Sequence, residues 1–173
     1  ESELERVSDR VSDMATGPCV VFTTSVGKAH LPFLTAPDPS DGLYSVTMEF
    51  EENDPIVQTL KNVVSEAASY AFGANLPYNF IDPINQSDAY DKRSYGMIYV
   101  LLKSTVSPLL VDALNIPLSR DIRVTEGDML RIAGWATAFR GQQSGVMLRL
   151  KMAKLISKAP EPHPRAATAF GDD

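Results

Sequence analysis

The chain has 173 residues, of which 44% are hydrophobic and 22% are charged, and it carries a formal net charge of −6. That length suits a single domain with short tails, and the composition is typical of a globular protein. One cysteine and two histidines leave almost nothing for a disulfide framework, a histidine-based metal site or a Ser-His-Asp triad. No apolar run approaches the ~20 residues that cross a bilayer, and residues 1–14 are too charged for a signal peptide. We therefore expect a soluble cytoplasmic protein without a metal or other cofactor.

The net charge conceals an uneven distribution along the chain. Residues 1–60 carry −8 and residues 61–91 carry −3, whereas residues 92–158 hold eleven Lys and Arg against four Asp and Glu, a net +7. Such a segment is typical of a surface that meets nucleic acid or another anionic partner. A solvated surface on which charge is simply uneven is the plain alternative.

The first half of the chain begins with a predicted helix and two predicted strands. Residues 1–14 place an apolar stripe among charges, which predicts a short amphipathic helix within an N-terminal extension over residues 1–17. Residues 19–26 are β-branched and end at a glycine, and residues 43–50 alternate between apolar and polar side chains. Each of these two segments predicts a strand, and we expect Cys19 to be buried in the first of them.

The clearest predicted element is a helix that begins after Asp54. Asp54 is a typical N-cap, Pro55 suits the first helical position, and an apolar stripe at helical spacing continues until Gly73. Residues 74–94 show no period and are polar with a few aromatic side chains. A loop this long inside a small domain is usually functional or mobile.

Three further strands are predicted over residues 95–103, 129–140 and 146–156, and a glycine-flanked turn joins the last two as a hairpin. The end of the chain is rich in Pro and Ala, which predicts a flexible acidic tail over residues 159–173. Five main strands and one helix favour a mainly β fold: a five-stranded OB-fold-like barrel over residues 18–158 with one main helix and long loops. An open α+β sheet with the helix on one face is the alternative.

The alternation of side chains along the predicted strands separates core from surface. The side chains predicted to face the core in the last two strands are Leu130, Ile132, Gly134, Ala136, Ala138, Val146, Leu148, Leu150 and Met152. The side chains predicted to face outward are Tyr95, Tyr99, Lys103, Arg131, Trp135, Arg149 and Lys151. Aromatic rings interleaved with Lys and Arg form a platform on which bases stack while the cations follow the phosphates. Packing of the rings beneath the helix or the long loop, and plain solvation of the cations, are the alternatives.

Other motifs do not support an enzyme. Residues 23–28 look like the end of a phosphate-binding loop, but Phe22 stands where that loop needs glycine and Ala29 where it needs Ser or Thr. The acidic residues of 38–41 and 51–54 fall in predicted turns and at the helix cap, so we expect them to be solvated or to cap backbone groups. We therefore predict no catalytic residue.

Four stretches of the chain together carry a family resemblance. They are a strand and turn leading into 42–50, the helix that begins at Asp54-Pro55, the segments 108–112 and 126–128, and 144–150 leading into the last strand. Across roughly residues 18–158 the chain resembles the single-stranded-DNA-binding proteins of bacteriophages, which are OB-fold replication proteins. The final Phe-Gly-Asp-Asp also resembles the start of the acidic tail with which such proteins recruit replication partners.

This resemblance implies a non-enzymatic, sequence-nonspecific protein that coats and protects single-stranded DNA in phage DNA replication or recombination. The residues then predicted to stack on bases are Trp135, Tyr99 and Tyr95. The residues predicted to contact phosphates are Arg131, Arg149, Lys151, Lys103 and Arg140. At the end of the long loop, the residues predicted to close over the strand are Lys92 and Arg93.

The expected partners are single-stranded DNA and, through the tail, replication proteins; a homodimer is left open, and no membrane is expected. The main alternative is an OB-like barrel for protein–protein interaction or virion assembly that binds no nucleic acid. A nuclease that uses the acidic residues is a third reading.

Overall fold

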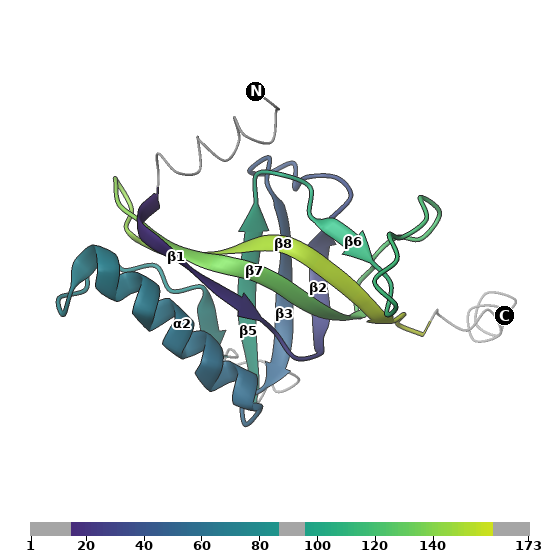
Figure 1. The fold of residues 1–173 in the computed structure, drawn as a ribbon, viewed down its shortest axis with the longest axis horizontal. Coiled ribbons are helices and arrows are strands. Elements are labelled where there is room, and N and C mark those ends of the chain that lie inside the picture. Colours follow the sequence, from purple (N-terminus) through teal and green to yellow (C-terminus); the bar gives the residue numbers. More distant parts are fainter. Residues whose placement is uncertain (1–14, 87–95, 161–173) are drawn as a thin grey trace, which may run out of the picture.

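The computed structural model describes residues 15–86 and 96–160, which form eight strands and one helix (Figure 1). In chain order the elements are β1 (Ala15–Thr23), β2 (Gly27–Phe33), β3 (Tyr44–Glu51), α2 (Pro55–Phe72), β4 (Ile84–Gln86), β5 (Met97–Ser104), β6 (Leu109–Val111), β7 (Met129–Phe139) and β8 (Gly145–Ser157). The predicted N-terminal helix, residues 87–94 of the long loop and nearly all of the predicted tail lie outside the described residues. No helix in the described part is long and apolar enough to cross a membrane.

Five of the strands close into a barrel. β2 pairs with β3, β3 with β5, β5 with β8, β8 with β7, and β7 returns to β2. Only the pairing of β5 with β8 is parallel within this ring. β1 is added to the outer edge of β7, β6 pairs with β8, and β4 pairs with β5. In Figure 1, β1, β7 and β8 cross in front of β2, β3 and β5. The predicted mainly β fold, a five-stranded barrel with one main helix, is confirmed.

The first strand of the barrel is not the predicted one. β1 ends at Thr23 and pairs only with β7, whereas β2, which the sequence analysis missed, closes the barrel. The pattern of β2 is hard to recognise because Leu31 has a φ of 48° and the pairing with β3 shifts register between His30 and Phe33. Within the segment expected to be a loop, β4 is a second missed strand, too short to show a period of two.

The predicted helix is confirmed as α2. Its N-cap Asp54 accepts a hydrogen bond through Oδ1 from the backbone N–H of Ile56 at 2.9 Å. It ends at Gly73, which has a φ of 62° and donates its backbone N–H to the carbonyl oxygen of Ser69 at 3.0 Å. The apolar stripe of α2 is buried against β1, β7 and β8, so the helix covers the barrel next to its longest hairpin.

The register of β7 against β8 determines which side chains fill the barrel. The predicted core residues that are buried are Leu130, Ile132, Gly134, Ala136, Ala138, Val146, Leu148 and Leu150. The prediction for Met152 is wrong. A bulge between Ala133 and Gly134 leaves Lys151 without a partner on β7, so the alternation of β8 shifts by one residue. Beyond the bulge, Ala153 is buried in place of Met152.

Gly134 lies at this bulge and approaches the backbone of β8 closely. A Cβ atom at this position would lie 1.8 Å from the carbonyl oxygen of Arg149 and 3.3 Å from Cζ of Phe22. The first distance is far inside van der Waals contact, and its partner is backbone that cannot rotate away. The pairing therefore requires glycine here.

Gly134→Ala is expected to lower the free energy of unfolding by about 2–3 kcal/mol, because the added methyl group forces the two strands apart. For a chain of this size that loss corresponds to a decrease in Tm of roughly 5–10 °C. Gly141→Ala is the matched control, since a Cβ there meets only the carbonyl oxygen of Gln143 at 3.8 Å. Thermal unfolding of both variants tests this, and equal Tm values would show that the close approach does not constrain the fold.

Asp128 connects the turn before β7 to the end of β8. Its buried carboxylate accepts hydrogen bonds from the backbone N–H groups of Thr125 at 2.8 Å and Ala159 at 2.7 Å, and from Nζ of Lys158 at 2.6 Å. Burial on its own would raise the pKa of Asp128. The three donors outweigh burial, and the pKa lies below its ordinary value of 3.8.

Asp128→Asn is expected to destabilise the protein near neutral pH by about 2 kcal/mol, because two backbone donors and an ammonium group lose a charged acceptor. Because the pKa of Asp128 is lower in the folded state, its ionised form stabilises the fold fully at a pH above its ordinary pKa. This stabilisation is lost as the pH falls through the folded-state pKa. Urea unfolding should therefore show that the wild type and the variant differ in free energy of unfolding at neutral pH, and that this difference is smaller at about pH 3. A difference that stays constant with pH would contradict the assigned role of the charge.

Candidate nucleic-acid interface

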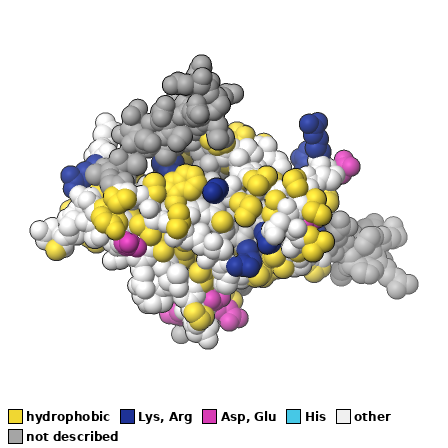
Figure 2. All heavy atoms as spheres, viewed as in Figure 1, with side chains coloured by type: hydrophobic (Ala, Val, Ile, Leu, Met, Phe, Trp, Pro, Cys, Tyr) yellow, Lys and Arg dark blue, Asp and Glu magenta, His cyan; other side chains and the backbone are white. Residues whose placement is uncertain are grey.

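β1, β7 and β8 together form an outer surface that carries only positive charge. The three strands contain no Asp or Glu, and their basic residues are Arg131, Arg149, Lys151 and Lys154. We call their outward side chains, with Lys151 at the bulge, the basic face: Cys19, Val21, Arg131, Ala133, Trp135, Thr137, Met147, Arg149, Lys151, Met152 and Lys154. Figure 2 shows hydrophobic side chains gathered along these strands, with Lys and Arg among them.

Trp135 lies near the middle of the basic face. It is paired with Val21 of β1 on one side and with Arg149 of β8 on the other. Its indole is half-buried, and Val21 beside it is 79% exposed. Trp135 thus lies on the outer side of the sheet, as predicted, with its indole partly exposed, and its role in stacking stays a prediction.

Arg131 and Lys154 lie directly opposite each other on β7 and β8. Arg131 donates Nε–H to the carbonyl oxygen of Thr24 at 3.1 Å. Within the described residues, no ion pair is formed by Arg131, Lys151 or Lys154. Like charges in opposed positions destabilise a sheet, and a bound anion relieves their repulsion. Lys154 could not be foreseen as an outward residue, because the bulge at Lys151 reverses the faces of the residues of β8 that follow it, as far as Leu155.

Arg149 is on the predicted face but is not exposed as predicted. It is 5% exposed, and its Nε–H donates to Oγ1 of Thr137 at 3.2 Å. The guanidinium therefore lies back against β7 rather than extending into solvent. Burial lowers the pKa of Arg149 from its ordinary value, although an arginine keeps its charge at neutral pH. The prediction that Arg149 is exposed to solvent is wrong, and its contact with a phosphate stays a prediction.

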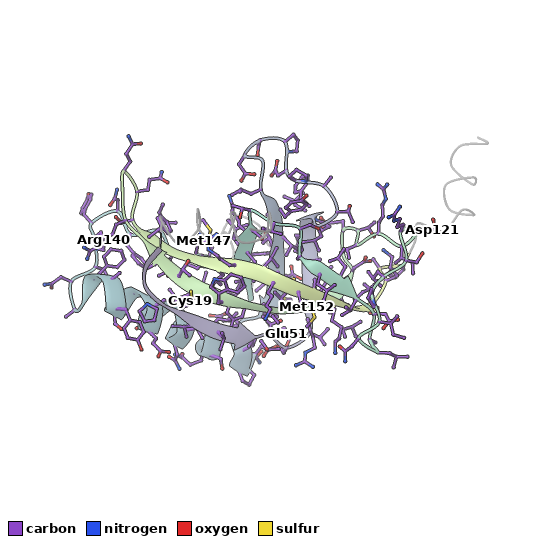
Figure 3. All side chains as sticks on the ribbon, turned by 45° about the horizontal axis from the view of Figure 1, so that its top comes forward. Cys19, Glu51, Asp121, Arg140, Met147 and Met152 are labelled. Atoms are coloured by element: carbon purple, nitrogen blue, oxygen red, sulfur yellow. The ribbon has the colours of Figure 1, made fainter. Side chains whose placement is uncertain are left out.

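Cys19 is exposed, contrary to the expectation that it is buried. Phe22 of β1 is buried in the core and Val20 packs against it, whereas Val21 between them points outward. Figure 3 shows Cys19 on β1 together with Met147 and Met152 along β8. The basic face therefore continues across all three strands.

Tyr99 and Lys103 lie on the outer side of β2, β3 and β5, which meets the basic face where Lys103 is paired with Arg149 of β8. The hydroxyl of Tyr99 donates to Oε1 of Glu49 at 3.0 Å. The ammonium of Lys103 lies 2.8 Å from Oδ2 of Asp41, and this hydrogen bond, helped by the backbone N–H of Leu43, lowers the pKa of Asp41. The structure thus does not bring Tyr99 and Trp135 together on one platform.

His30 and two carboxylates extend this second surface. Nδ1 of His30 lies 2.5 Å from Oε2 of Glu126, and Nε2 lies 3.2 Å from Oε1 of Glu49. The contact between Nε2 of His30 and Glu49 is within ion-pair distance, but its geometry is not that of a hydrogen bond. The imidazole also meets the ring of Tyr99 edge-on, with centroids 5.7 Å apart. This surface is acidic and bonded within itself, which makes it unfavourable for a polyanion.

The remaining predicted site residues are either engaged elsewhere or not described. Arg140 hydrogen-bonds through Nη2 to the carbonyl oxygen of Ala71, and its guanidinium lies over the ring of Phe72 at 5.0 Å from the centroid. It therefore ties the end of β7 to the end of α2. The predicted residues that lie outside the described part of the chain are Lys92, Arg93 and Tyr95.

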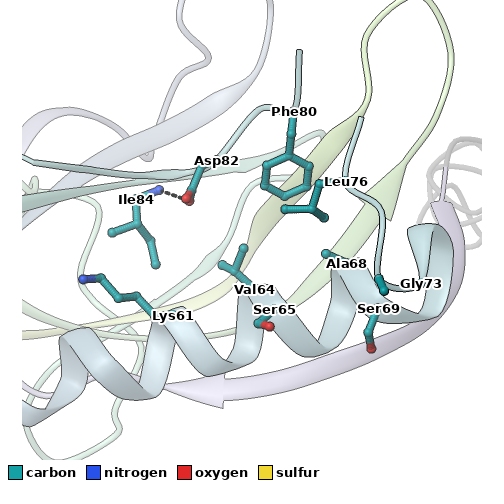
Figure 4. Close-up of a pocket in the computed structure, with 11 residues that line it drawn as sticks. Lys61, Val64, Ser65, Ala68, Ser69, Gly73, Leu76, Phe80, Asp82 and Ile84 are labelled. Carbon is teal, nitrogen blue, oxygen red and sulfur yellow. Dashed lines mark hydrogen bonds between the residues drawn. The ribbon is translucent and has the colours of Figure 1, made fainter. Parts of the chain in front are cut away.

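An apolar pocket of about 380 Å³ lies between α2 and the segment that follows it (Figure 4). Val64 and Ala68 of the helix form one wall, and Leu76 and Phe80 form the other. Lys61 and Asp82 are the charged side chains of its lining. Apolar and small side chains make up most of its lining. Across the described residues, no group of three or more His, Cys, Asp or Glu side chains could hold a metal ion.

Comparison with solved structures identifies proteins of the same architecture. Gp2.5, a single-stranded-DNA-binding protein encoded by bacteriophage T7, superposes with a TM-score of 0.69 at 17% identity, over 88% of this chain and 94% of that one. The chain has the fold of phage single-stranded-DNA-binding proteins.

The single-stranded-DNA-binding protein from bacteriophage Enc34 supports the same conclusion. Its C-terminally truncated form gives a TM-score of 0.68 at 15% identity, over 83% of this chain and 88% of that one. Its complex with single-stranded DNA gives 0.62 at 14% identity, over 82% of this chain and 88% of that one. No protein-family model matches the chain, and no curated protein matches it in sequence.

Proposed function

We propose that the protein binds single-stranded DNA along the basic face, without recognising a defined sequence. The observation that carries the proposal is the placement of Trp135 on β7, in a three-strand surface that holds Arg131, Lys151 and Lys154 and no acidic residue. Bases stack on an exposed ring while unpaired cations neutralise the phosphates, a combination that tolerates any sequence. The phage proteins that share the fold support this reading, one of them in complex with single-stranded DNA.

The basic face is long enough for a short stretch of DNA. From Arg131 to Phe139 the strand β7 spans eight residue steps, or about 26 Å at ~3.3 Å per residue. The cations at one end and Trp135 at the middle would be met in turn by a strand that runs along β7. In this role the protein is a non-enzymatic binding protein, and its interface requires neither a metal nor a cofactor.

We further propose that this binding coats and protects single-stranded DNA during phage DNA replication or recombination, in the cytoplasm of the host cell. Lys92, Arg93 and Tyr95 would add to the interface from the loop before β5, and the C-terminal tail would recruit replication proteins. Lys103 and Arg140 would contact the strand where it leaves the basic face.

Protein–protein interaction without nucleic acid remains the alternative, and the pocket beside α2 favours it. Leu76 lines that pocket and is 54% exposed, and Tyr78 in the same segment is fully exposed. Retention on single-stranded DNA at low salt separates the two functions, because an interaction module of this kind is not retained.

Trp135→Ala is expected to weaken binding of a labelled oligo(dT) by about 1–3 kcal/mol, or roughly 5- to 150-fold, because one base loses its stacking partner. Fluorescence anisotropy measures the affinity, and quenching of wild-type tryptophan emission reports the same contact directly. Tyr78→Ala is the matched control, since it removes a fully exposed ring away from the basic face. Equal affinities of the Trp135 variant and the wild type would place the DNA elsewhere.

Affinity is expected to fall with salt, with a log–log slope of about −0.7 for each phosphate neutralised on a single strand. Arg131→Ala and Lys154→Ala should each reduce the slope by about that amount and weaken all sequences alike. Lys61→Ala, on the exposed side of α2, should leave the slope unchanged. A salt-independent affinity, or an effect of Lys61 as large as that of Arg131, would overturn the proposed phosphate track.

A further inference from the structure

A second pocket of about 380 Å³ opens at the end of the basic face, where the β7–β8 hairpin meets β5 and the segment that leads into β4. Its apolar lining includes Ile81, Leu101, Phe139 and Met147. Its polar lining includes Asp82, whose Oδ1 accepts from the backbone N–H of Ile84, together with Asn85, Lys103 and Gln143. The volume is at the lower end of the ~300–1,000 Å³ of small-molecule pockets. It suits one flat ring system rather than a large ligand.

Backbone hydrogen bonds hold the walls of this pocket in place. The N–H of Ile81 donates to the carbonyl oxygen of Ser144 at 2.9 Å, and the N–H of Val146 donates back to the carbonyl oxygen of Ile81 at 3.1 Å. On the opposite wall, the N–H of Leu101 donates to the carbonyl oxygen of Pro83 at 3.0 Å. A Cβ at Gly145 would lie 2.4 Å from the carbonyl oxygen of Ile81, so this approach depends on glycine. The pocket is therefore formed before any ligand arrives.

The pocket continues the proposed path of the DNA. Trp135, Thr137 and Phe139 are alternate residues of β7 and so lie on the same face of the sheet, and Met147 is paired with Thr137. Phe139 is about 13 Å along the strand from Trp135, at ~3.3 Å per residue. A single strand that stacks on Trp135 would reach the pocket with its next few nucleotides.

Two side-chain amides at the pocket have no other role in the described structure. Neither Asn85 nor Gln143 makes a side-chain hydrogen bond there, and both have exposed side chains. A carboxamide offers a donor and an acceptor side by side, which is the arrangement that pairs with the edge of a nucleobase. Lys103 lines the same pocket with its ammonium paired to Asp41.

We propose that this pocket receives one unstacked nucleobase of the bound strand and that Asn85 and Gln143 read its edge. This inference rests on the proposed function. It adds a base preference to an interface whose other contacts do not depend on sequence. Phe139 and Met147 provide the apolar wall against which the base packs.

The test compares the affinities of oligo(dT), oligo(dA) and oligo(dC) for the full chain and for the Asn85→Ala/Gln143→Ala double variant. Self-stacking of the oligonucleotides contributes equally to both proteins, so only a change in the ratios reports the pocket. A good amide–base pair discriminates by about 1–3 kcal/mol, so the ratio between the best and worst base should narrow at least ~5-fold in the double variant. The matched control is Asn79→Ala/Gln142→Ala, which removes an exposed Asn and Gln that do not line the pocket.

The outcomes separate this inference from the proposed function. A double variant that binds all three oligonucleotides with the wild-type ratios overturns the pocket and leaves the basic face as the binding surface. Uniform weakening of all three, with the ratios unchanged, also overturns it, because the amides would then contact the DNA backbone. Failure of the wild-type protein to bind any of the three would overturn the proposed function itself. Equal unfolding midpoints of the two double variants exclude a general loss of structure.

Discussion

The antiparallel pairing of β7 with β8 determines both the barrel and its outer surface. These strands close the ring between β2 and β5, and their pairing passes a bulge at which the carbonyl oxygen of Arg149 comes within 1.8 Å of where a Cβ of Gly134 would be. On the inside, small and branched apolar residues of both strands fill the barrel. On the outside, the same register places Trp135 beside Arg149 and Arg131 opposite Lys154. A change that separates the two strands would therefore disrupt the core and the interface together.

The two outer surfaces of the barrel differ in how their charges are satisfied. On the side of β2, β3 and β5, Lys103 pairs with Asp41, and the ring nitrogens of His30 lie within 2.5 Å and 3.2 Å of Glu126 and Glu49. On the basic face, Arg131 and Lys154 face one another without a carboxylate among the described residues. Paired charges are already neutralised, whereas two opposed cations repel until an anion arrives. The unpaired cations therefore make the basic face the more favourable of the two surfaces for a polyanion.

Much of the fold follows from local patterns in the sequence. The helix was predictable because its capping residues and its apolar stripe agree, and the inward residues of β5 and β7 were predictable because both strands alternate without interruption. β2 was not, since a positive φ at Leu31 and a register shift interrupt its alternation. The exchange of β1 for β2 as a barrel strand is a matter of tertiary pairing, which no local pattern contains.

The site was predictable only where the strands alternate regularly. Trp135 and Arg131 could be placed on the outer face because β7 is regular, whereas the bulge at Lys151 hid Lys154 and misplaced Met152. The burial of Arg149 depends on where its long side chain lies, and alternation gives only the direction of its first bond. Tyr99 and Lys103 were assigned outward positions correctly, but which outward surface they share depends on how the barrel closes. Asn85 and Gln143 line the same pocket because Ile81 pairs with the β7–β8 hairpin, a tertiary contact that no local pattern contains.

Similar folds at 14–17% identity show that this barrel tolerates almost complete replacement of its sequence. Function in such a fold depends on the side chains of particular surfaces rather than on the barrel itself. The basic face of this chain presents one tryptophan and a row of cations, with a pocket at its end.

Photochemical crosslinking to an oligonucleotide that carries 5-iododeoxyuridine locates the bound strand most directly, since the crosslink forms with the side chain that contacts the base. After irradiation, mass spectrometry of the digested complex identifies the crosslinked residue. Binding along the basic face predicts crosslinks in β7 and β8, with Trp135 foremost among them. Crosslinks confined to Tyr99 and its neighbours on β3 and β5 would place the DNA on the acidic surface and contradict the assignment.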